Sequence, residues 1–238
     1  VRSGAFDFGV RPPYVPGDGF VGVVSSVGAD VDGGWVGRRV AAHTGGFRGS
    51  GGYRERGVVG ESALVPVPSG VDPLTAAALL HDAVTALALL EAAEIRPGER
   101  VLVTAAAGGM GTLLLQLAGG HVVGAARGER KLELVRSLGA SAVDYSRPGW
   151  AASAGGPFDV VFDGAGGAVG RAAFGITADG GRFSNHGAAG GGFADVTARR
   201  GIRVRGIADV QLSPERMREL LTRALDLVAR GELRPHIG

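Results

Sequence analysis

The strongest constraint on the fold is a run of alternating strand-like and helix-like segments that begins at Val101. Short apolar runs bounded by turn residues predict buried strands, and the segments between them have the spacing of helices. Strands that alternate with helices favour an α/β architecture with a parallel, doubly wound sheet. The predicted strands are 101–104, 121–126, 142–144, 158–162 and 181–184, and the predicted helices are 112–118, 129–138 and 169–177.

The first 70 residues carry a different pattern, in which strand-like runs are separated by Gly, Pro and Asp clusters. This pattern predicts a β-rich region. Asp72 before Pro73 predicts a helix start with Asp72 as the N-cap, and Ser213 before Pro214 predicts another. The predicted strands are 20–27, 39–42 and 62–67, and the predicted helices are 74–80, 82–93 and 213–230.

Glycine and proline are frequent, with 44 Gly and 11 Pro among 238 residues. They stand between periodic apolar runs, so we interpret them as turns rather than as disorder. The formal net charge is +2 and the basic residues are scattered, which argues against a nucleic-acid partner. Because no apolar run approaches the ~20 residues of a membrane span, we expect no membrane segment.

The chain contains no cysteine, and its five histidines include no spaced pair of the H-x-x-x-H kind. Disulfides and cysteine-ligated zinc are therefore excluded, and we expect no metal site. The absence of cysteine also fits a reducing, cytoplasmic location.

Two crossovers are short for a parallel sheet. The helix after Gly111 has room for about 12 Å, whereas strands usually span ~17–20 Å. The second crossover has room for a helix only at 150–154. We therefore hypothesise that residues are missing near Ala118 and Gly119 and within 153–156.

A glycine-rich turn, residues 105–111, stands between the predicted strand 101–104 and a helix. This is the context that a dinucleotide-binding fingerprint of the Rossmann type requires. Gly108 lets the backbone approach a pyrophosphate, and Gly111 lets the helix pack on the strand, while Ala106 replaces the first glycine of the fingerprint. The alternative is a tight structural turn in a glycine-rich protein.

The end of the second strand carries cations where an NAD site has a carboxylate. Arg127, Arg130 and Lys131 follow the strand, and they would suit the 2′-phosphate of NADPH. Glu129 is the exception, although it lies past the usual position of the acid. The alternative is a solvated helix face.

Short motifs follow one another in one order along nearly the whole chain. They are residues 1–4, 14–17, 22–28, 37–40, 76–78, 97–103, 105–111, 138–140, 158–163 and 180–183. In this order they resemble the zeta-crystallin-like quinone oxidoreductases, the zinc-free branch of the medium-chain dehydrogenase/reductase superfamily. The whole set is specific, although single motifs are not.

The resemblance implies a catalytic domain built on a partly open, GroES-like β-barrel, followed by a Rossmann domain, with NADPH in the cleft between them. We assign 1–94 to the catalytic domain and its linking helices, 95–212 to the Rossmann domain, and 213–238 to a helix returning toward the catalytic domain. The residues implied at the cofactor are Thr85, Gly108, Gly109, Met110, Lys131, Tyr145, Gly164, Asn185, His186 and Gly187, to which the charge argument adds Arg127.

The chain also departs from the pattern of the resembled family. The family's opening strands would precede Val1 and a returning segment would follow Gly238, so we expect the longer chain to be active and 1–238 alone to be poorly folded or inactive. Phe6 stands where relatives carry a tyrosine, and it predicts an apolar wall of the substrate pocket. Gly19 stands where many relatives carry glutamate.

Without a metal, the implied chemistry is hydride transfer from NADPH to a quinone or an α,β-unsaturated carbonyl compound. The candidate proton donors are His43, Tyr53, His81 and His186, each of which could instead be structural. Among the candidate proton donors, His81 has the best neighbouring acid, Asp82, although Asp82 could equally be a helix N-cap.

Two rival functions share the fold and the cofactor: an enoyl-thioester reductase and a non-catalytic NADPH-binding protein of the crystallin type. The resemblance also implies a homodimer. Its interface would include the strand-like segment 201–207 as an unpaired sheet edge.

Overall fold

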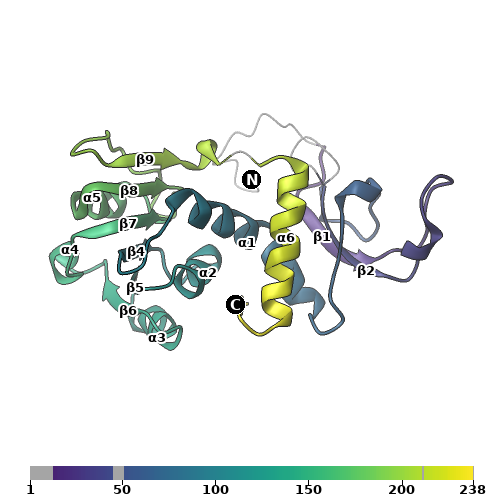
Figure 1. Ribbon diagram of the computed structural model, residues 1–238, viewed down its shortest axis with the longest axis horizontal. Helices are drawn as coiled ribbons and strands as arrows, with labels where there is room; N and C mark the ends of the chain where they lie inside the picture. Colours follow the sequence, from purple (N-terminus) through teal and green to yellow (C-terminus); the bar gives the residue numbers. More distant parts are fainter. Residues whose placement is uncertain (1–12, 45–50, 211, 238) are drawn as a thin grey trace. The chain divides into compact units, whose positions relative to one another are not determined.

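The structure is a computed structural model that describes residues 13–44, 51–210 and 212–237 (Figure 1). Its internal contacts divide the chain into two compact units. Unit 1 comprises Val1–Val84 and Leu212–Gly238, and unit 2 comprises Thr85–Gln211. The domain boundaries expected from the sequence stay a prediction.

Unit 2 is built on strands that alternate with helices. Its elements are the C-terminal part of α1 (Pro73–Ala93), β4 (Arg100–Thr104), α2 (Gly109–Leu117), β5 (His121–Ala126), α3 (Glu129–Ser137), β6 (Ser141–Asp144), α4 (Trp150–Ser153), β7 (Phe158–Asp163), α5 (Gly167–Gly175), β8 (Thr177–Asn185), β9 (Arg203–Gly206) and the 3-10 turn η4 (Ile207–Asp209).

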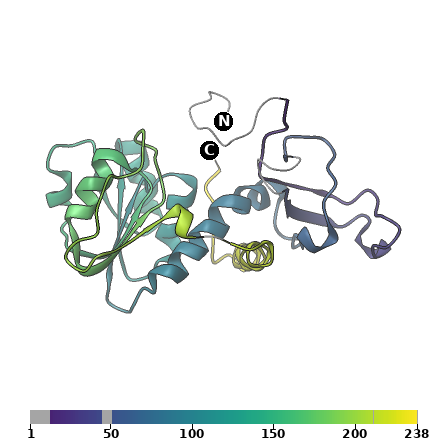
Figure 2. The same ribbon diagram turned by 90° about the horizontal axis from the view of Figure 1, so that it is seen from above.

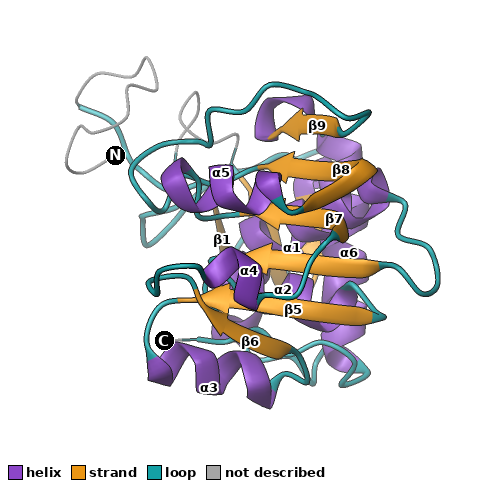
Figure 3. Ribbon diagram, turned by 90° about the vertical axis from the view of Figure 1, so that its left-hand side faces the viewer, coloured by secondary structure: helices purple, strands orange, loops and turns teal. Residues whose placement is uncertain are grey.

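Neighbouring strands of unit 2 all run parallel, in the order β6-β5-β4-β7-β8-β9. The chain moves outward from β4 to β6 and then crosses back to β7, so the sheet is doubly wound with its switch point between β4 and β7. α4 and α5 cover one face of the sheet, and α2 lies against the other (Figures 1 and 3). The parallel sheet predicted from the alternating pattern is confirmed.

Each of the two short crossovers contains a short helix in the structure. α2, with nine residues, connects β4 to β5, and α4, with four residues, lies between β6 and β7. The hypothesis of missing residues at these two positions stays a prediction.

The core of unit 2 lies between the sheet and these helices. Phe174 of α5 and Phe183 of β8 meet edge to face, with ring centroids 5.2 Å apart. Gly124 of β5 allows a close approach of α3, because a Cβ there would lie 2.5 Å from a side-chain methyl of Val135. The apolar strands thus pack as the sequence predicts.

The two helices predicted at 74–80 and 82–93 are one helix, α1, so their separation is wrong. His81 and Asp82 look like a polar break, but one face of a helix can carry them while Ala83 and Val84 face the core. Asp82 lies within α1, and its interpretation as an N-cap is therefore also wrong.

The predicted helix starts are confirmed. The Asp72 carboxylate accepts hydrogen bonds from the backbone N–H groups of Leu74 and Thr75, at 3.0 and 3.1 Å. The Ser213 hydroxyl accepts one from the backbone N–H of Arg216, at 3.2 Å. Capping is a local signal, which explains why the sequence alone predicts it.

Within the described residues, α1 is the one helix long and apolar enough to cross a membrane by length and composition. The sequence pattern divides this stretch at the polar pair 81–82, whereas in the structure the helix continues through it. Of the most apolar window of α1, 56% is buried inside the structure, as in a core helix.

Unit 1 contains a three-stranded antiparallel sheet in the order β1-β2-β3, with bounds β1 (Gly19–Val23), β2 (Arg39–His43) and β3 (Leu64–Pro66). The 3-10 turns η1 (Gly33–Trp35) and η3 (Glu61–Ala63) lie between these strands along the chain. α6 (Pro214–Ala229), which Figure 2 views almost along its axis, packs on β3 and η3. A β-rich region in addition to the parallel sheet is confirmed, and the described part of the predicted barrel consists of these three strands.

Candidate active site

The glycine-rich turn lies where β4 ends and α2 begins, at the switch point of the sheet. The backbone N–H of Gly108 donates to the carbonyl of Ala105 at 2.9 Å, and that of Ala106 donates to the carbonyl of Ala125 in β5 at 3.1 Å. Ala105 adopts a positive φ of 51° to make this tight turn. The turn therefore presents the first N–H groups of α2, a favourable position for a phosphate.

Of the two fingerprint glycines, Gly111 is the one at which no side chain fits. A Cβ there would lie 2.5 Å from the carbonyl oxygen of Ala105 and 2.7 Å from that of Ala106, so α2 packs directly on the turn. A Cβ at Gly108 would lie 3.2 Å from the same Ala105 oxygen. These close approaches fit a cradle for the pyrophosphate of a dinucleotide.

The pairing of β5 with β6 brings Arg127 and Tyr145 together at the end of the second strand. The Arg127 guanidinium lies 5.8 Å from the centroid of the Tyr145 ring, and Lys131 is the third residue of α3, the helix that follows β5. Glu129 stands between Arg127 and Lys131 in the sequence, and its carboxylate lies 2.6 Å from a guanidinium nitrogen of Arg136. The Glu129 carboxylate is therefore paired within α3.

A buried hydrogen-bond network joins the ends of β4 and β7. The Thr104 hydroxyl donates to Asp163 at 2.6 Å and accepts from the backbone N–H of Ala165 at 3.0 Å. The same Asp163 oxygen accepts from the backbone N–H of Gly166 at 3.1 Å. Burial raises the pKa of Asp163, against these hydrogen bonds. The network fixes the loop that follows β7.

Gly164 and Gly187 lie against each other, because a Cβ on Gly187 would be 2.3 Å from the Gly164 carbonyl oxygen. The backbone N–H groups of His186 and Gly187 both donate to the Asp163 carbonyl, at 3.1 and 3.0 Å. Asn185 closes its own loop, since its side chain donates to and accepts from the backbone of Ala194. All four predicted residues thus lie beside the Thr104–Asp163 network, because Asn185 pairs with Asp163 in the β7–β8 register, and their assignment to the cofactor stays a prediction.

His186 is half-buried, and its Nδ1 lies 3.2 Å from the Ser184 hydroxyl. Burial lowers the pKa of His186 to about 4, so the ring is neutral at neutral pH. A neutral imidazole can donate a hydrogen bond but is not a strong general acid.

The remaining candidates belong to α1 and unit 1. Thr85 is 7% exposed on α1, and Tyr53 is 74% exposed. His43 and His81 both face Asp18, at 3.9 and 3.8 Å between Nδ1 and Oδ2. The predicted pocket residue Phe6 lies outside the described residues.

Two family models match the chain. Residues 106–226 match the model described as "Zinc-binding dehydrogenase", and residues 1–69 match the model described as "Alcohol dehydrogenase GroES-like domain". The bovine (Bos taurus) quinone oxidoreductase-like protein 2 is 34% identical over 245 residues, which cover 95% of this chain and 69% of the relative. The chain belongs to the quinone oxidoreductase group of the medium-chain dehydrogenase/reductases.

Two further quinone oxidoreductases are similar to this chain. The mouse (Mus musculus) quinone oxidoreductase is 36% identical over 147 residues, which cover 60% of this chain but only 44% of the relative. The quinone oxidoreductase of Thermus thermophilus, solved with and without NADPH, matches with a TM-score of 0.72 and 37% identity. That match covers 98% of this chain and 72% of the solved one. The resemblance inferred from the sequence is confirmed.

The name of the first family model refers to zinc. Over residues 13–44, 51–210 and 212–237, no group of three or more His, Cys, Asp or Glu side chains is placed to hold a metal ion. The chain also has no cysteine. The residues present therefore do not fit the cysteine-containing zinc sites of dehydrogenases.

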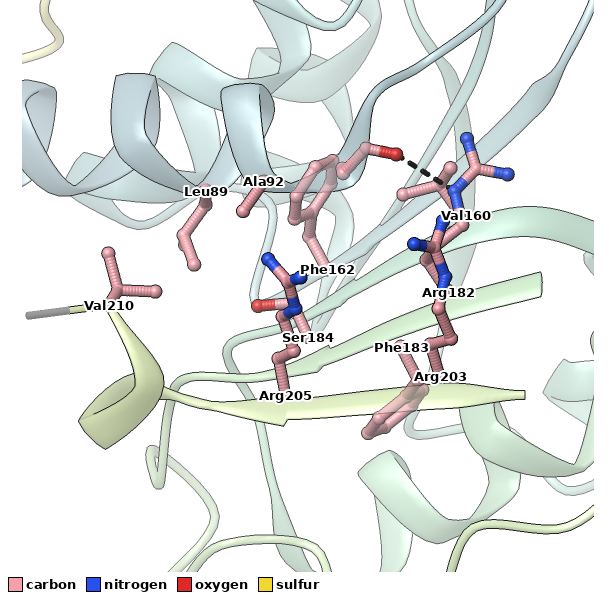
Figure 4. Close-up of a pocket in the computed structure, with 11 residues that line it drawn as sticks. Leu89, Ala92, Val160, Phe162, Arg182, Phe183, Ser184, Arg203, Arg205 and Val210 are labelled. Carbon is pink, nitrogen blue, oxygen red and sulfur yellow. Dashed lines mark hydrogen bonds between the residues drawn. The ribbon is translucent and has the colours of Figure 1, made fainter. Parts of the chain in front are cut away.

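A small pocket of unit 2 lies between α1 and strands β7, β8 and β9 (Figure 4). Its volume of about 20 Å³ is close to that of one water molecule, so it cannot hold a quinone ring. At its edge, the Arg182 Nε donates to the Ala93 carbonyl at 2.8 Å, and both terminal nitrogens donate to the Glu99 carboxylate. This contact is a structural clamp between β8 and the end of α1.

Sequence reasoning missed two acidic residues, Asp163 and Asp18. Asp163 ends an apolar strand and precedes Gly164, and a carboxylate at such a strand end was the signal available. Asp18 lies in a Gly- and Pro-rich turn, where an aspartate is ordinary. Only the pairing of distant segments brings these two acids to Thr104 and to the histidines.

Proposed function

We propose that this protein is a zinc-independent oxidoreductase that transfers hydride from NADPH to a quinone or an α,β-unsaturated carbonyl compound. The observation that carries the proposal is the glycine cradle at β4–α2 with Arg127, Lys131 and Tyr145 at the neighbouring strand end. The names of the relatives support the acceptor class.

When bound, the reduced nicotinamide supplies the hydride. The N–H groups at the start of α2 bind the pyrophosphate, and the cations after β5 bind the 2′-phosphate. The Thr104–Asp163 network holds the loop of Gly164 in place, so that this backbone presents one constant surface to the cofactor. Orientation of donor and acceptor and exclusion of water then account for most of the rate enhancement.

The function is tested by following the absorbance of NADPH with a panel of acceptors, before and after dialysis against a chelator. We expect turnover with a 1,4-quinone or an enone, and equal rates after chelation. Turnover of an enoyl thioester alone would replace this proposal with the enoyl-thioester reductase. Tight NADPH binding without turnover of any acceptor would favour the non-catalytic binding protein. A cytoplasmic location stays a prediction.

We expect NADPH to bind more tightly than NADH, because a charge-assisted contact contributes about 1.5–3 kcal/mol, or roughly ten- to a hundredfold. The Lys131→Ala variant should lose about tenfold or more in NADPH affinity and keep its NADH affinity, both measured by titration calorimetry. Arg171→Ala on α5 removes the same charge from an exposed site in the same unit and is the matched control. Equal affinities for the two cofactors in the wild type would contradict the assignment.

We further propose a homodimer that pairs the edge strand β9, which has β8 as its neighbour on one side only. Sedimentation velocity over a concentration series is expected to show a dimer at micromolar concentration. A monomer throughout that range would refute the proposal.

A further inference from the structure

Three titratable side chains from separate segments meet in unit 1. Asp18 precedes β1, His43 ends β2, and His81 lies on α1. The Asp18 Oδ2 is 3.8 Å from the His81 Nδ1 and 3.9 Å from the His43 Nδ1. Both distances are those of ion pairs rather than of hydrogen bonds.

The pairing of β1 with β2 fixes this arrangement. Gly19 lies opposite His43 in the antiparallel register, and the backbone N–H of Thr44 donates to the Asp18 carbonyl at 2.9 Å. A Cβ on Gly19 would lie 2.6 Å from the Ala42 carbonyl oxygen, so the strands approach closely at this point. The Asp18 carboxylate is thereby held beside the end of β2.

Both histidines lie beside the single Asp18 carboxylate, but their side chains differ in exposure to solvent. The His43 side chain is 13% exposed, and neither of its ring nitrogens has a hydrogen-bond partner. The His81 side chain is 68% exposed. Burial lowers the pKa of His43, whereas the interaction with Asp18 raises the pKa of His81 against its partial burial. As the pH rises, His81 therefore keeps its proton longer than His43 does.

The ring of His81 has a defined orientation in this pair. Its Nδ1 faces Asp18, so its Nε2 points away from that carboxylate, on a side chain that is largely exposed. Thr85, the residue that the resemblance assigns to the nicotinamide, lies four residues further along α1. Residues four apart share one face of a helix.

We propose that Asp18 is the positioning residue for His81, and that His81 donates the proton that completes reduction of the acceptor. The inference rests on the proposed function and names the proton donor of that site. With an enone, a C–H bond of the reduced nicotinamide would break, its hydride would form a C–H bond at the β-carbon, and the π electrons would move to the carbonyl oxygen. The Nε2–H bond of His81 breaks as its proton goes to that oxygen, and the exposed ring regains a proton from water.

Titration of the histidine rings by NMR tests the positioning role without turnover. The described groups that set the charge state of His81 are Asp18, His43 and the neighbouring Asp82 on α1. Spectra of His81→Gln and His43→Gln assign the signals. We expect Asp18→Asn to lower the pKa of His81, and the matched control Asp30→Asn, which removes an exposed carboxylate of the same unit, to leave it unchanged. An unchanged His81 pKa in Asp18→Asn would overturn the positioning role.

The pH profile of kcat with an enone tests the donor role. We expect His81→Gln to lose about 10²- to 10⁴-fold in kcat with little change in KM. In Asp18→Asn, the alkaline limb of the profile should move to lower pH together with the pKa from NMR. Wild-type kcat in His81→Gln would overturn the donor role and leave the proposed function intact. No turnover of any acceptor by the wild type would reject the function and the donor role together, while the NMR titration still decides the Asp18–His81 coupling.

Discussion

Replacing Gly111 with alanine is expected to abolish tight nucleotide binding. The new Cβ would lie 2.5 and 2.7 Å from two backbone carbonyl oxygens, of Ala105 and Ala106, and neither can move without displacing the turn. Overpacking of this kind costs about 1–3 kcal/mol in stability. Because the turn also aims the first N–H groups of α2, we expect NADPH affinity to fall by at least about a hundredfold, which corresponds to ~2.7 kcal/mol.

Calorimetric titration with NADPH and thermal unfolding measure these two effects. The matched control is Gly175→Ala, at the end of α5, where no atom lies within 4 Å of the new Cβ. This control should bind NADPH as the wild type does, because the added methyl group meets open space. A Gly111→Ala variant with wild-type affinity would show that the turn is only a structural loop.

The Arg182→Met variant is expected to lose about 3–5 kcal/mol in the free energy of unfolding. It leaves the Glu99 carboxylate and the Ala93 and Glu94 carbonyls without their guanidinium partner. The paired side chains are only 12% and 15% exposed, so solvent screens them little. Urea unfolding at neutral pH measures the loss.

The same pair predicts acid sensitivity. Arg182 lowers the pKa of Glu99 from its ordinary 4.5 to about 2. A depressed carboxyl pKa stabilises the folded state above pH 4.5, and that contribution is lost as the pH falls from 4.5 toward 2. The contribution is on the order of 3 kcal/mol. Arg182→Met should remove this dependence of stability on pH over that window.

The exposed pair of Arg136 with Glu129 provides the control for the clamp. Its nitrogen–oxygen distance is 2.6 Å, but the side chains are 50% and 66% exposed. Arg136→Met should therefore cost less than about 1 kcal/mol. Equal losses in Arg182→Met and Arg136→Met would mean that burial does not strengthen the clamp.

The sequence by itself determined the features that depend on neighbouring residues. The apolar runs of β4, β5 and β7 predict the parallel sheet, because buried strands need apolar side chains on both faces. The caps at Asp72 and Ser213 follow from hydrogen bonds that span two or three residues. The glycine turn before α2 follows from strand, turn and helix in direct succession.

Two local predictions failed for one reason. The pair His81–Asp82 resembles the end of a helix, and the sequence predicts a helix that continues to residue 177 with the next strand beginning only at residue 181. In the structure, α1 continues through residues 81 and 82, and β8 already begins at Thr177. Packing against the sheet and pairing of Thr177 with Phe158 override the local preference in each case.

Only the tertiary structure decided the polar contacts of the candidate site and the clamp. Thr104 meets Asp163, Arg182 meets Glu99, and Asp18 meets His81 across separations of more than 50 residues along the chain. Each contact depends on strand register or on the packing of a helix, neither of which leaves a local trace at the two residues. A carboxylate in a turn or at a strand end has the same appearance in sequence whether it faces water or a buried partner, because burial and partner are properties of the folded chain.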